Sequence, residues 1–294
     1  MAGGENEELQ LFLDQLRDGR TQYVRLSYCA VGESGCKSIA NILSENESLR
    51  YLYLENNDLD RVGAAAIAMS LKRNSTLSHL SLVNCHIGND SAYAIAQALE
   101  SNRSLVKVLL DNNNIGSEGG GVLGQCLKHN TTLTHLSLFQ NRIGSDGATN
   151  IGIALQSNQS LKMLQLESNM IGTEGGIAIG QGLESNSSLQ TLSLLRNNIG
   201  IEGAKAFAKA LRTSQSLLEL DLEHNDLKPQ GEQLIIDALR QNNVLRVLRI
   251  TVTTQQAAQQ MQDVAKQKQH PIDIYISSPL SRVDVPTYST QKTL

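Results

Sequence analysis

The 294-residue chain has no tryptophan and only ten aromatic residues, seven Tyr and three Phe. Its four cysteines show no C-x-x-C spacing, so the sequence carries neither a zinc signature nor a disulfide framework. A formal net charge of −4 gives no electrostatic support for nucleic-acid binding. No apolar run approaches the roughly 18 residues that span a bilayer, and residues 1–10 lack a secretory signal. We therefore expect a cytoplasmic protein without membrane contact, with the nucleus as the alternative compartment.

What the chain does have is a phrase that recurs every 28 residues. The copy from Leu105 to Gly116 reads LVKVLLDNNNIG, which fits the pattern L-x-x-L-x-L-x-x-N-x-I-G. A weaker copy near Val24 precedes the eight full ones. Because a fixed period of this length is the signature of stacked units, it predicts one solenoid domain. The eight full copies open at Leu49, Leu77, Leu105, Leu133, Leu161, Leu189, Leu217 and Leu245.

Each unit combines two hydrophobic periods. Apolar residues alternate in the first half, as from Leu161 to Leu166, which predicts a short strand with one buried face. The second half has small and apolar residues at i, i+3, i+4 and i+7, as from Ala64 to Leu71, which predicts a helix. Parallel strands stack about 4.8 Å apart whereas a helix needs about 10 Å. We therefore predict an α/β solenoid curved like a horseshoe, with parallel strands on the concave face and helices on the convex face.

Small residues in the helical halves are expected to reduce the spacing of neighbouring helices. Glycine inside a helix costs up to about 1 kcal/mol relative to alanine, so a close approach of two helices is our interpretation of its presence. The glycines concerned are Gly120, Gly121, Gly124, Gly152, Gly176 and Gly180.

Two sets of asparagines recur in register. The asparagine of each phrase, Asn113 for example, follows the strand, and its amide can bond the backbone of neighbouring turns as a ladder. Cys29 and Cys85 occupy this position in two units and are expected to be structural thiols. The second set lies just beyond each helix, where a left-handed asparagine often ends a helix, so we expect no glycosylation there. Its members open Asn-x-Ser/Thr sequons at Asn46, Asn74, Asn102, Asn130, Asn158 and Asn186.

The repeats need covers at both ends, since a stack of units exposes apolar faces there. We expect an N-terminal capping helix in residues 1–20, leucine-rich repeats in residues 21–250 and a C-terminal capping repeat in residues 251–276. Residues 277–294, with two prolines and many hydroxyls, are predicted to form a flexible tail.

The phrase and its 28-residue period resemble the ribonuclease-inhibitor-like class of leucine-rich repeats, over roughly residues 21–276. That class includes ribonuclease inhibitor, the sensing segments of NOD-like receptors, Ran GTPase-activating proteins and tropomodulin. The resemblance implies a curved platform for another protein. This chain departs from individual members, because it has few cysteines, one repeat type, no ATPase module and no strongly acidic tail. The matching residues build the coil, so they do not select among these functions.

Residues that point away from the core on successive strands form three columns on the predicted concave face. Aromatic and arginine side chains, which are enriched in binding hot spots, gather at its start. Glu219, Asp221 and Glu223 project together near its end and form an acidic patch with Glu167, beside Arg196 and Arg249. The alternatives are tyrosines that stack only for stability and an acidic face that is only solvated. Our candidate partner-binding residues are Tyr23, Arg25, Tyr51, Tyr53, Phe139, Glu219, Asp221 and Glu223.

Catalytic, cofactor and metal sites are not expected. His79 and His135 lie two repeats apart, about 10 Å, which is too far for a shared metal or a direct proton relay. We therefore predict a non-enzymatic, monomeric scaffold that binds a protein partner on its concave face. One alternative is a GTPase-activating regulator, with Arg142 and Arg196 as exposed loop arginines. Another is an actin-filament regulator.

Overall fold

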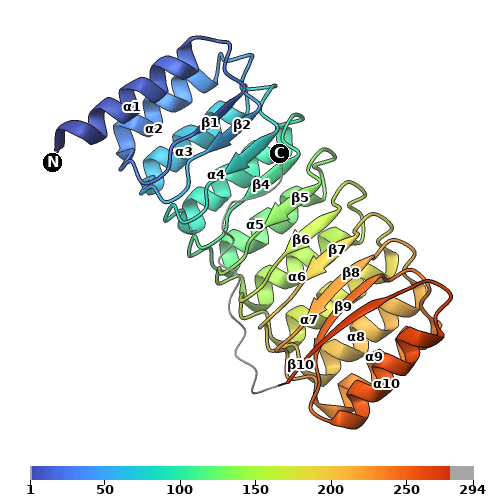
Figure 1. Ribbon diagram of the computed structural model, residues 1–294. Coiled ribbons are helices and arrows are strands. Elements are labelled where there is room, and N and C mark those ends of the chain that lie inside the picture. The colour runs from blue at the N-terminus through green and yellow to red at the C-terminus, as the bar shows by residue number, and fades with distance from the viewer. Residues whose placement is uncertain (1, 279–294) are drawn as a thin grey trace.

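The structure is a computed structural model that describes the backbone of residues 2–278 and the side chains of residues 9–278. In this part of the chain ten helices alternate with ten strands (Figure 1). The helices are α1 (Ala2–Arg17), α2 (Gly32–Leu43), α3 (Asp60–Leu71), α4 (Gly88–Ser101), α5 (Ser117–Leu127), α6 (Gly144–Leu155), α7 (Gly172–Ser185), α8 (Gly200–Thr213), α9 (Lys228–Gln241) and α10 (Gln255–Gln267). The strands are β1 (Tyr23–Arg25), β2 (Tyr51–Tyr53), β3 (His79–Ser81), β4 (Lys107–Leu109), β5 (His135–Ser137), β6 (Met163–Gln165), β7 (Thr191–Ser193), β8 (Glu219–Leu222), β9 (Val247–Thr251) and β10 (Asp273–Ser277).

The strands form one parallel sheet in sequence order, β1 to β10. Equivalent residues pair across every junction from β1 to β9, as Tyr23 does with Tyr51, so the register follows the 28-residue period. The last junction is shorter, since Ile276 of β10 pairs with Ile250 of β9. Residues 279–294, most of the segment expected to be a flexible tail, lie outside the described residues.

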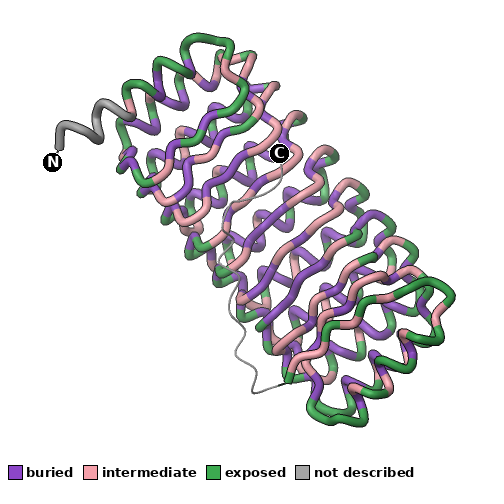
Figure 2. The backbone as a smooth tube through the Cα atoms, in the orientation of Figure 1, coloured by how far each residue is buried: buried purple, intermediate pink, exposed green. Residues whose placement is uncertain are grey.

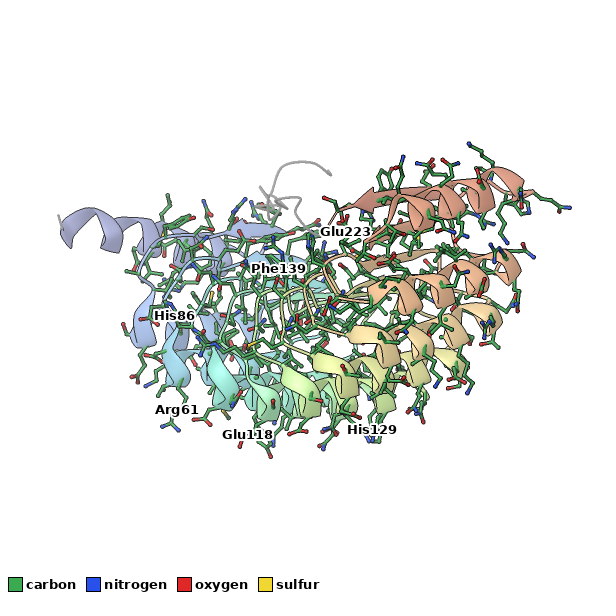
Figure 3. The ribbon with its side chains drawn as sticks, turned by 90° about the horizontal axis from the view of Figure 1, so that it is seen from below. Arg61, His86, Glu118, His129, Phe139 and Glu223 are labelled. Atoms are coloured by element: carbon green, nitrogen blue, oxygen red, sulfur yellow. The ribbon has the colours of Figure 1, made fainter. Side chains whose placement is uncertain are left out.

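The predicted horseshoe is confirmed. Strands line the inner side of the arc and helices its outer side (Figures 1 and 3). A continuous apolar core lies between the two layers, visible as the buried inner band of the tube in Figure 2. The leucines that open the phrases are all buried in it, as are Phe12, Leu13 and Leu16 of α1. None of the helices in the described residues is long and apolar enough to cross a membrane.

Close packing of the helices explains most of the helical glycines. A Cβ on Gly180 would lie 2.7 Å from the Cβ of Ala206, and a Cβ on Gly124 would lie 2.8 Å from the backbone of Asn150. Comparable clashes would arise at Gly120, Gly152 and Gly176, so the interpretation holds for these positions. Gly121 differs, because a Cβ there would make only an ordinary contact at 3.5 Å.

The asparagine ladder is also confirmed. The buried side chain of Asn197 donates to Leu166 O at 2.8 Å and accepts from the Asn169 N–H at 2.9 Å. The same contacts link consecutive units along the stack and satisfy backbone groups that would otherwise be buried unpaired. Where Cys85 replaces the asparagine, its thiol donates to Leu54 O at 3.0 Å. Burial raises the pKa of this thiol to about 12, as expected for a structural cysteine.

The asparagines beyond the helices do not have the left-handed conformation that we expected. Asn102 has φ −69° and ψ 136°, and Asn186 is similarly extended. The amide of Asn102 donates to Leu71 O in the previous unit at 2.8 Å, and its Oδ1 accepts from the Leu105 N–H. The side chain, rather than a backbone reversal, thus satisfies the turn. Asn102, like its equivalents at 74, 130, 158 and 186, is buried by these contacts.

Candidate partner-binding face

The concave face begins with an aromatic cluster on β1 to β3. The ring of Tyr23 lies 5.3 Å from that of Tyr53 and 6.3 Å from that of Tyr51, centre to centre. The Tyr51 ring in turn lies 4.5 Å from the ring of His79. Tyr23 and Tyr51 are exposed despite this stacking. Burial, followed by the neighbouring Tyr23, raises the pKa of the half-buried Tyr53.

Beside this cluster both oxygens of the Glu55 carboxylate have a donor. Nη2 of Arg25 lies 2.7 Å from Oε2 of Glu55, and the Ser81 hydroxyl donates to Oε1 at 2.9 Å. Glu55 is buried, so these contacts compensate the loss of water around its charge. The four candidate residues Tyr23, Arg25, Tyr51 and Tyr53 therefore lie together, around a carboxylate that our site prediction had left out.

The remaining candidates lie elsewhere on the face. Phe139 follows β5 and is half-buried on the inner side of the arc, as is Glu223 after β8 (Figure 3). By contrast Arg61, Glu118 and His129 lie on the outer side. From β2 to β8 there are six strand spacings, roughly 29 Å, so the aromatic and acidic groups form two separate regions.

The acidic region is built on β8, where Glu219, Asp221 and Glu223 are half-buried. The Glu223 N–H donates to Oδ1 of Asp221 at 2.9 Å. Burial raises the pKa of Asp221 to about 6, with a smaller contribution of the same sign from the Glu223 charge. The guanidinium of Arg249 lies 5.1 Å from the ring centre of Tyr275 on β10.

A second period, of 56 residues, emerges from the contacts on this face. Carboxylates recur after every second strand, and the strand that follows each of the first three carries a serine. The Ser81 hydroxyl donates to Glu55 and the Ser137 hydroxyl donates to Asp111, whereas the Ser193 hydroxyl donates to Asp221 of the next strand at 3.5 Å. The four carboxylates are Glu55, Asp111, Glu167 and Glu223. The single repeat type that we read from the sequence therefore holds for the coil but not for its concave face.

Several of these side chains are less exposed than their outward position implied. Ser81, Ser137 and Ser193 are buried, and so are Glu167 and Leu195. The serine hydroxyls donate to neighbouring carboxylates. Only part of each outward column is thus available to a partner.

The histidines of the concave strands take part in local hydrogen bonds. His79 Nδ1 lies 2.8 Å from the Ser78 hydroxyl, and His135 Nδ1 lies 2.6 Å from the Thr134 hydroxyl. Burial, together with the nearby Lys107 charge, lowers the pKa of both rings. The described residues contain no group of three or more His, Cys, Asp or Glu that could hold a metal ion.

Comparison with known proteins identifies the repeat. The leucine-rich-repeat family model matches residues 45–68, 73–96, 129–152, 157–180, 185–208 and 213–233. The chain belongs to the leucine-rich-repeat proteins, and its strand–helix units are consistent with the ribonuclease-inhibitor-like class. A search of curated protein sequences found no match.

One solved structure supports the same fold. The leucine-rich-repeat protein LegL7 from Legionella pneumophila is similar over 88% of this chain and 83% of its own, with a TM-score of 0.56 and 15% identity. Leiomodin-1 actin-binding site 2 aligns with 55% of this chain and 79% of its own (TM-score 0.39, 21% identity). The tropomodulin C-terminal domain of Caenorhabditis elegans aligns with 60% of this chain and 91% of its own (TM-score 0.37, 17% identity). At 15% identity the similarity to LegL7 concerns the fold alone.

Proposed function

We propose that this chain is a non-enzymatic scaffold that binds a protein partner on its concave face and acts as a monomer. The observation that carries the proposal is the exposed, stacked aromatic cluster at β1 to β3. The coil itself is built from leucine, asparagine and small residues, so its architecture does not require tyrosines there. Exposed aromatic side chains beside an arginine are the usual anchors of a protein interface.

Two features support recognition rather than catalysis. Glu55 and Asp111 accept hydrogen bonds from serine hydroxyls, and His79 and His135 bond the hydroxyls of the residues that directly precede them. We propose that Tyr23, Arg25, Tyr51 and Tyr53 form one contact region and Glu219, Asp221 and Glu223 another, with Phe139 between them. No specific observation on the concave face favours the GTPase-activating or actin-regulating alternatives.

Site-specific photo-crosslinking in cells tests this proposal. A benzoylphenylalanine replaces Tyr23 on the concave face or Tyr93 on helix α4. The two tyrosines are a matched pair, because they are 55% and 53% exposed but lie on opposite layers of the solenoid. We expect a protein adduct from position 23 that is absent from position 93. Equal adducts from both positions, or an adduct from position 93 alone, would contradict the concave site.

A further inference from the structure

The carboxylates that recur every second repeat are separated by apolar residues at the same repeat position. Val83, Phe139 and Leu195 occupy this position in the intervening units. Acidic and apolar residues therefore alternate along the sheet at this position. Neighbours in the row are about 4.8 Å apart, the distance between adjacent strands. Val83, Asp111, Phe139 and Glu223 of this row are half-buried, so the accessible part of the row combines charge with apolar surface.

Glu167 differs from the other members of this row. Its side chain is only 6% exposed, and its Oε2 has no hydrogen-bond partner. Glu55, by contrast, is paired with Arg25, and Asp111 accepts from the Phe139 N–H at 2.9 Å in addition to the Ser137 hydroxyl. A buried carboxylate oxygen without a donor is costly in a free protein. The unpaired Oε2 therefore indicates that a donor from another molecule binds to Glu167.

The chain itself shows which group completes such a carboxylate. At Glu55 the donor is a guanidinium, which reaches the carboxylate from the neighbouring strand at 2.7 Å. Ser137 stands at the equivalent of Arg25 relative to Glu167, two residues and one strand earlier, and its hydroxyl is already bonded to Asp111. The arrangement at Glu167 thus has the acceptor but lacks the internal cation.

The neighbours of Glu167 suit a long cationic side chain. Phe139 and Leu195 occupy the equivalent position on the two adjacent units, so the neighbours of Glu167 on both sides are apolar, with Phe139 half-buried and Leu195 buried. Lys and Arg bury their aliphatic stems against such surface while the charged end seeks an anion. Further along, Asp221 and Glu223 add negative charge that attracts a cation toward this end of the face.

We infer that Glu167 receives a lysine or arginine side chain of the protein partner, with Phe139 and Leu195 flanking its stem. This inference rests on the proposed function, and it defines the partner as a protein with an exposed basic segment. Oε2 is closed to solvent in the free chain, so the glutamate side chain turns outward when the cation arrives.

Selection of displayed random dodecapeptides against the full chain tests the inference. We expect peptides that crosslink to benzoylphenylalanine at position 139 to be enriched in Lys and Arg. Their affinity should fall at least tenfold in Glu167→Gln, because one partner of a buried charge pair is removed. Glu174→Gln is the matched control, since it makes the same change in an exposed residue of α7, on the outer layer of the same unit. Its affinity should be unchanged.

The outcomes separate the two proposals. Concave-binding peptides without basic enrichment, or with equal affinity for Glu167→Gln and the parent, overturn the inference and leave the proposed function standing. Failure to find any peptide that crosslinks at position 139 or 23 counts against the proposed function itself.

Discussion

Glu55 and Glu167 occupy the same position in two units of one solenoid, yet their surroundings differ. Both are buried, but Glu55 accepts from the Ser81 hydroxyl of the following strand at 2.9 Å, whereas Oε1 of Glu167 accepts from the Gln165 amide at 3.5 Å. Glu55 has Arg25 as an ion-pair partner at 2.7 Å, whereas Glu167 has an oxygen with no donor. Burial raises the pKa of Glu167 to about 7, to which the charges of Asp111 and Asp221 add a smaller increase.

The contrast between Glu55 and Glu167 shows that one solenoid backbone can carry two kinds of surface. The leucines and asparagines that build the stack recur in every unit, so the backbone at the two sites is nearly the same. Outward residues on the strands do not support the coil and can therefore vary. At the first site they form a self-sufficient group of tyrosines, arginine and carboxylate. At the second they leave a charge unsatisfied, which lowers stability in the free chain but favours binding.

Removal of the Arg25 side chain should have the largest effect on stability, because it makes the site of Glu55 resemble that of Glu167. Arg25→Ala leaves Glu55 buried without a cation, so we expect a loss of about 2–3 kcal/mol in the free energy of unfolding at pH 7. The estimate is below that for a fully buried pair because Arg25 is partly exposed. Chemical denaturation measures the change. In the double variant Arg25→Ala/Glu55→Gln most of the loss should be recovered, and equal losses in the single and double variants would contradict an electrostatic cause.

The substitution Glu167→Gln should raise the free energy of unfolding, opposite to the effect of Arg25→Ala. Glu167 has a folded-state pKa of about 7, above its ordinary 4.5, so the folded chain holds the proton more tightly. The contribution of this carboxyl to the free energy of unfolding is present in full below pH 4.5 and is lost as the pH rises through 7. Ionised Glu167 therefore destabilises the folded chain. Glu167→Gln should therefore stabilise the chain by about 1–2 kcal/mol at pH 8 and by little at pH 4.5.

Denaturation of this variant at both pH values checks the prediction, with Glu174→Gln as the exposed control. A gain in stability that is the same at pH 4.5 and pH 8 would refute ionisation as the origin. Since Gln resembles the protonated acid in shape, the fold should be retained in either case.

The smallest effect is expected at the aromatic cluster. Tyr23→Ala removes two ring contacts and should cost about 1 kcal/mol of stability. Tyr93→Ala, at a tyrosine of similar exposure without a ring partner among the described contacts, should cost less. If Tyr23→Ala lowers stability but leaves partner binding intact, stacking rather than recognition explains the tyrosines.

The architecture was predictable because hydrophobic burial and backbone hydrogen bonding use the same residue types in every unit. Leu105 and Asn113, for instance, are each repeated at 28 residues and have the inward positions expected of them. The tyrosine cluster was predictable for a similar reason, since parallel register brings Tyr23 and Tyr51 side by side.

The rest depended on distances that a single period does not reveal. The link between Glu55 and Ser81 appears only when alternate units are compared, since the residues are 26 apart and the pattern recurs at 56. A search for a doubled period would have found it. The extended backbone at Asn102 was missed because two backbone geometries can end a helix, and the side-chain bond to the preceding unit decides between them. Burial of Ser137 and Leu195 depends on their neighbours in space, which residue identity alone does not specify.

The most direct test is a carbon-13 NMR titration of the Glu167 side-chain carboxyl in the free protein and with a saturating lysine- or arginine-containing peptide from the selection. The pKa of Glu167 should be about 7 in the free protein, and it should drop below 4.5 in the complex as the cation stabilises the ionised form. A carboxyl that titrates near 4.5 without the peptide, or whose titration is unchanged by it, would contradict an unpaired acceptor awaiting a cationic partner.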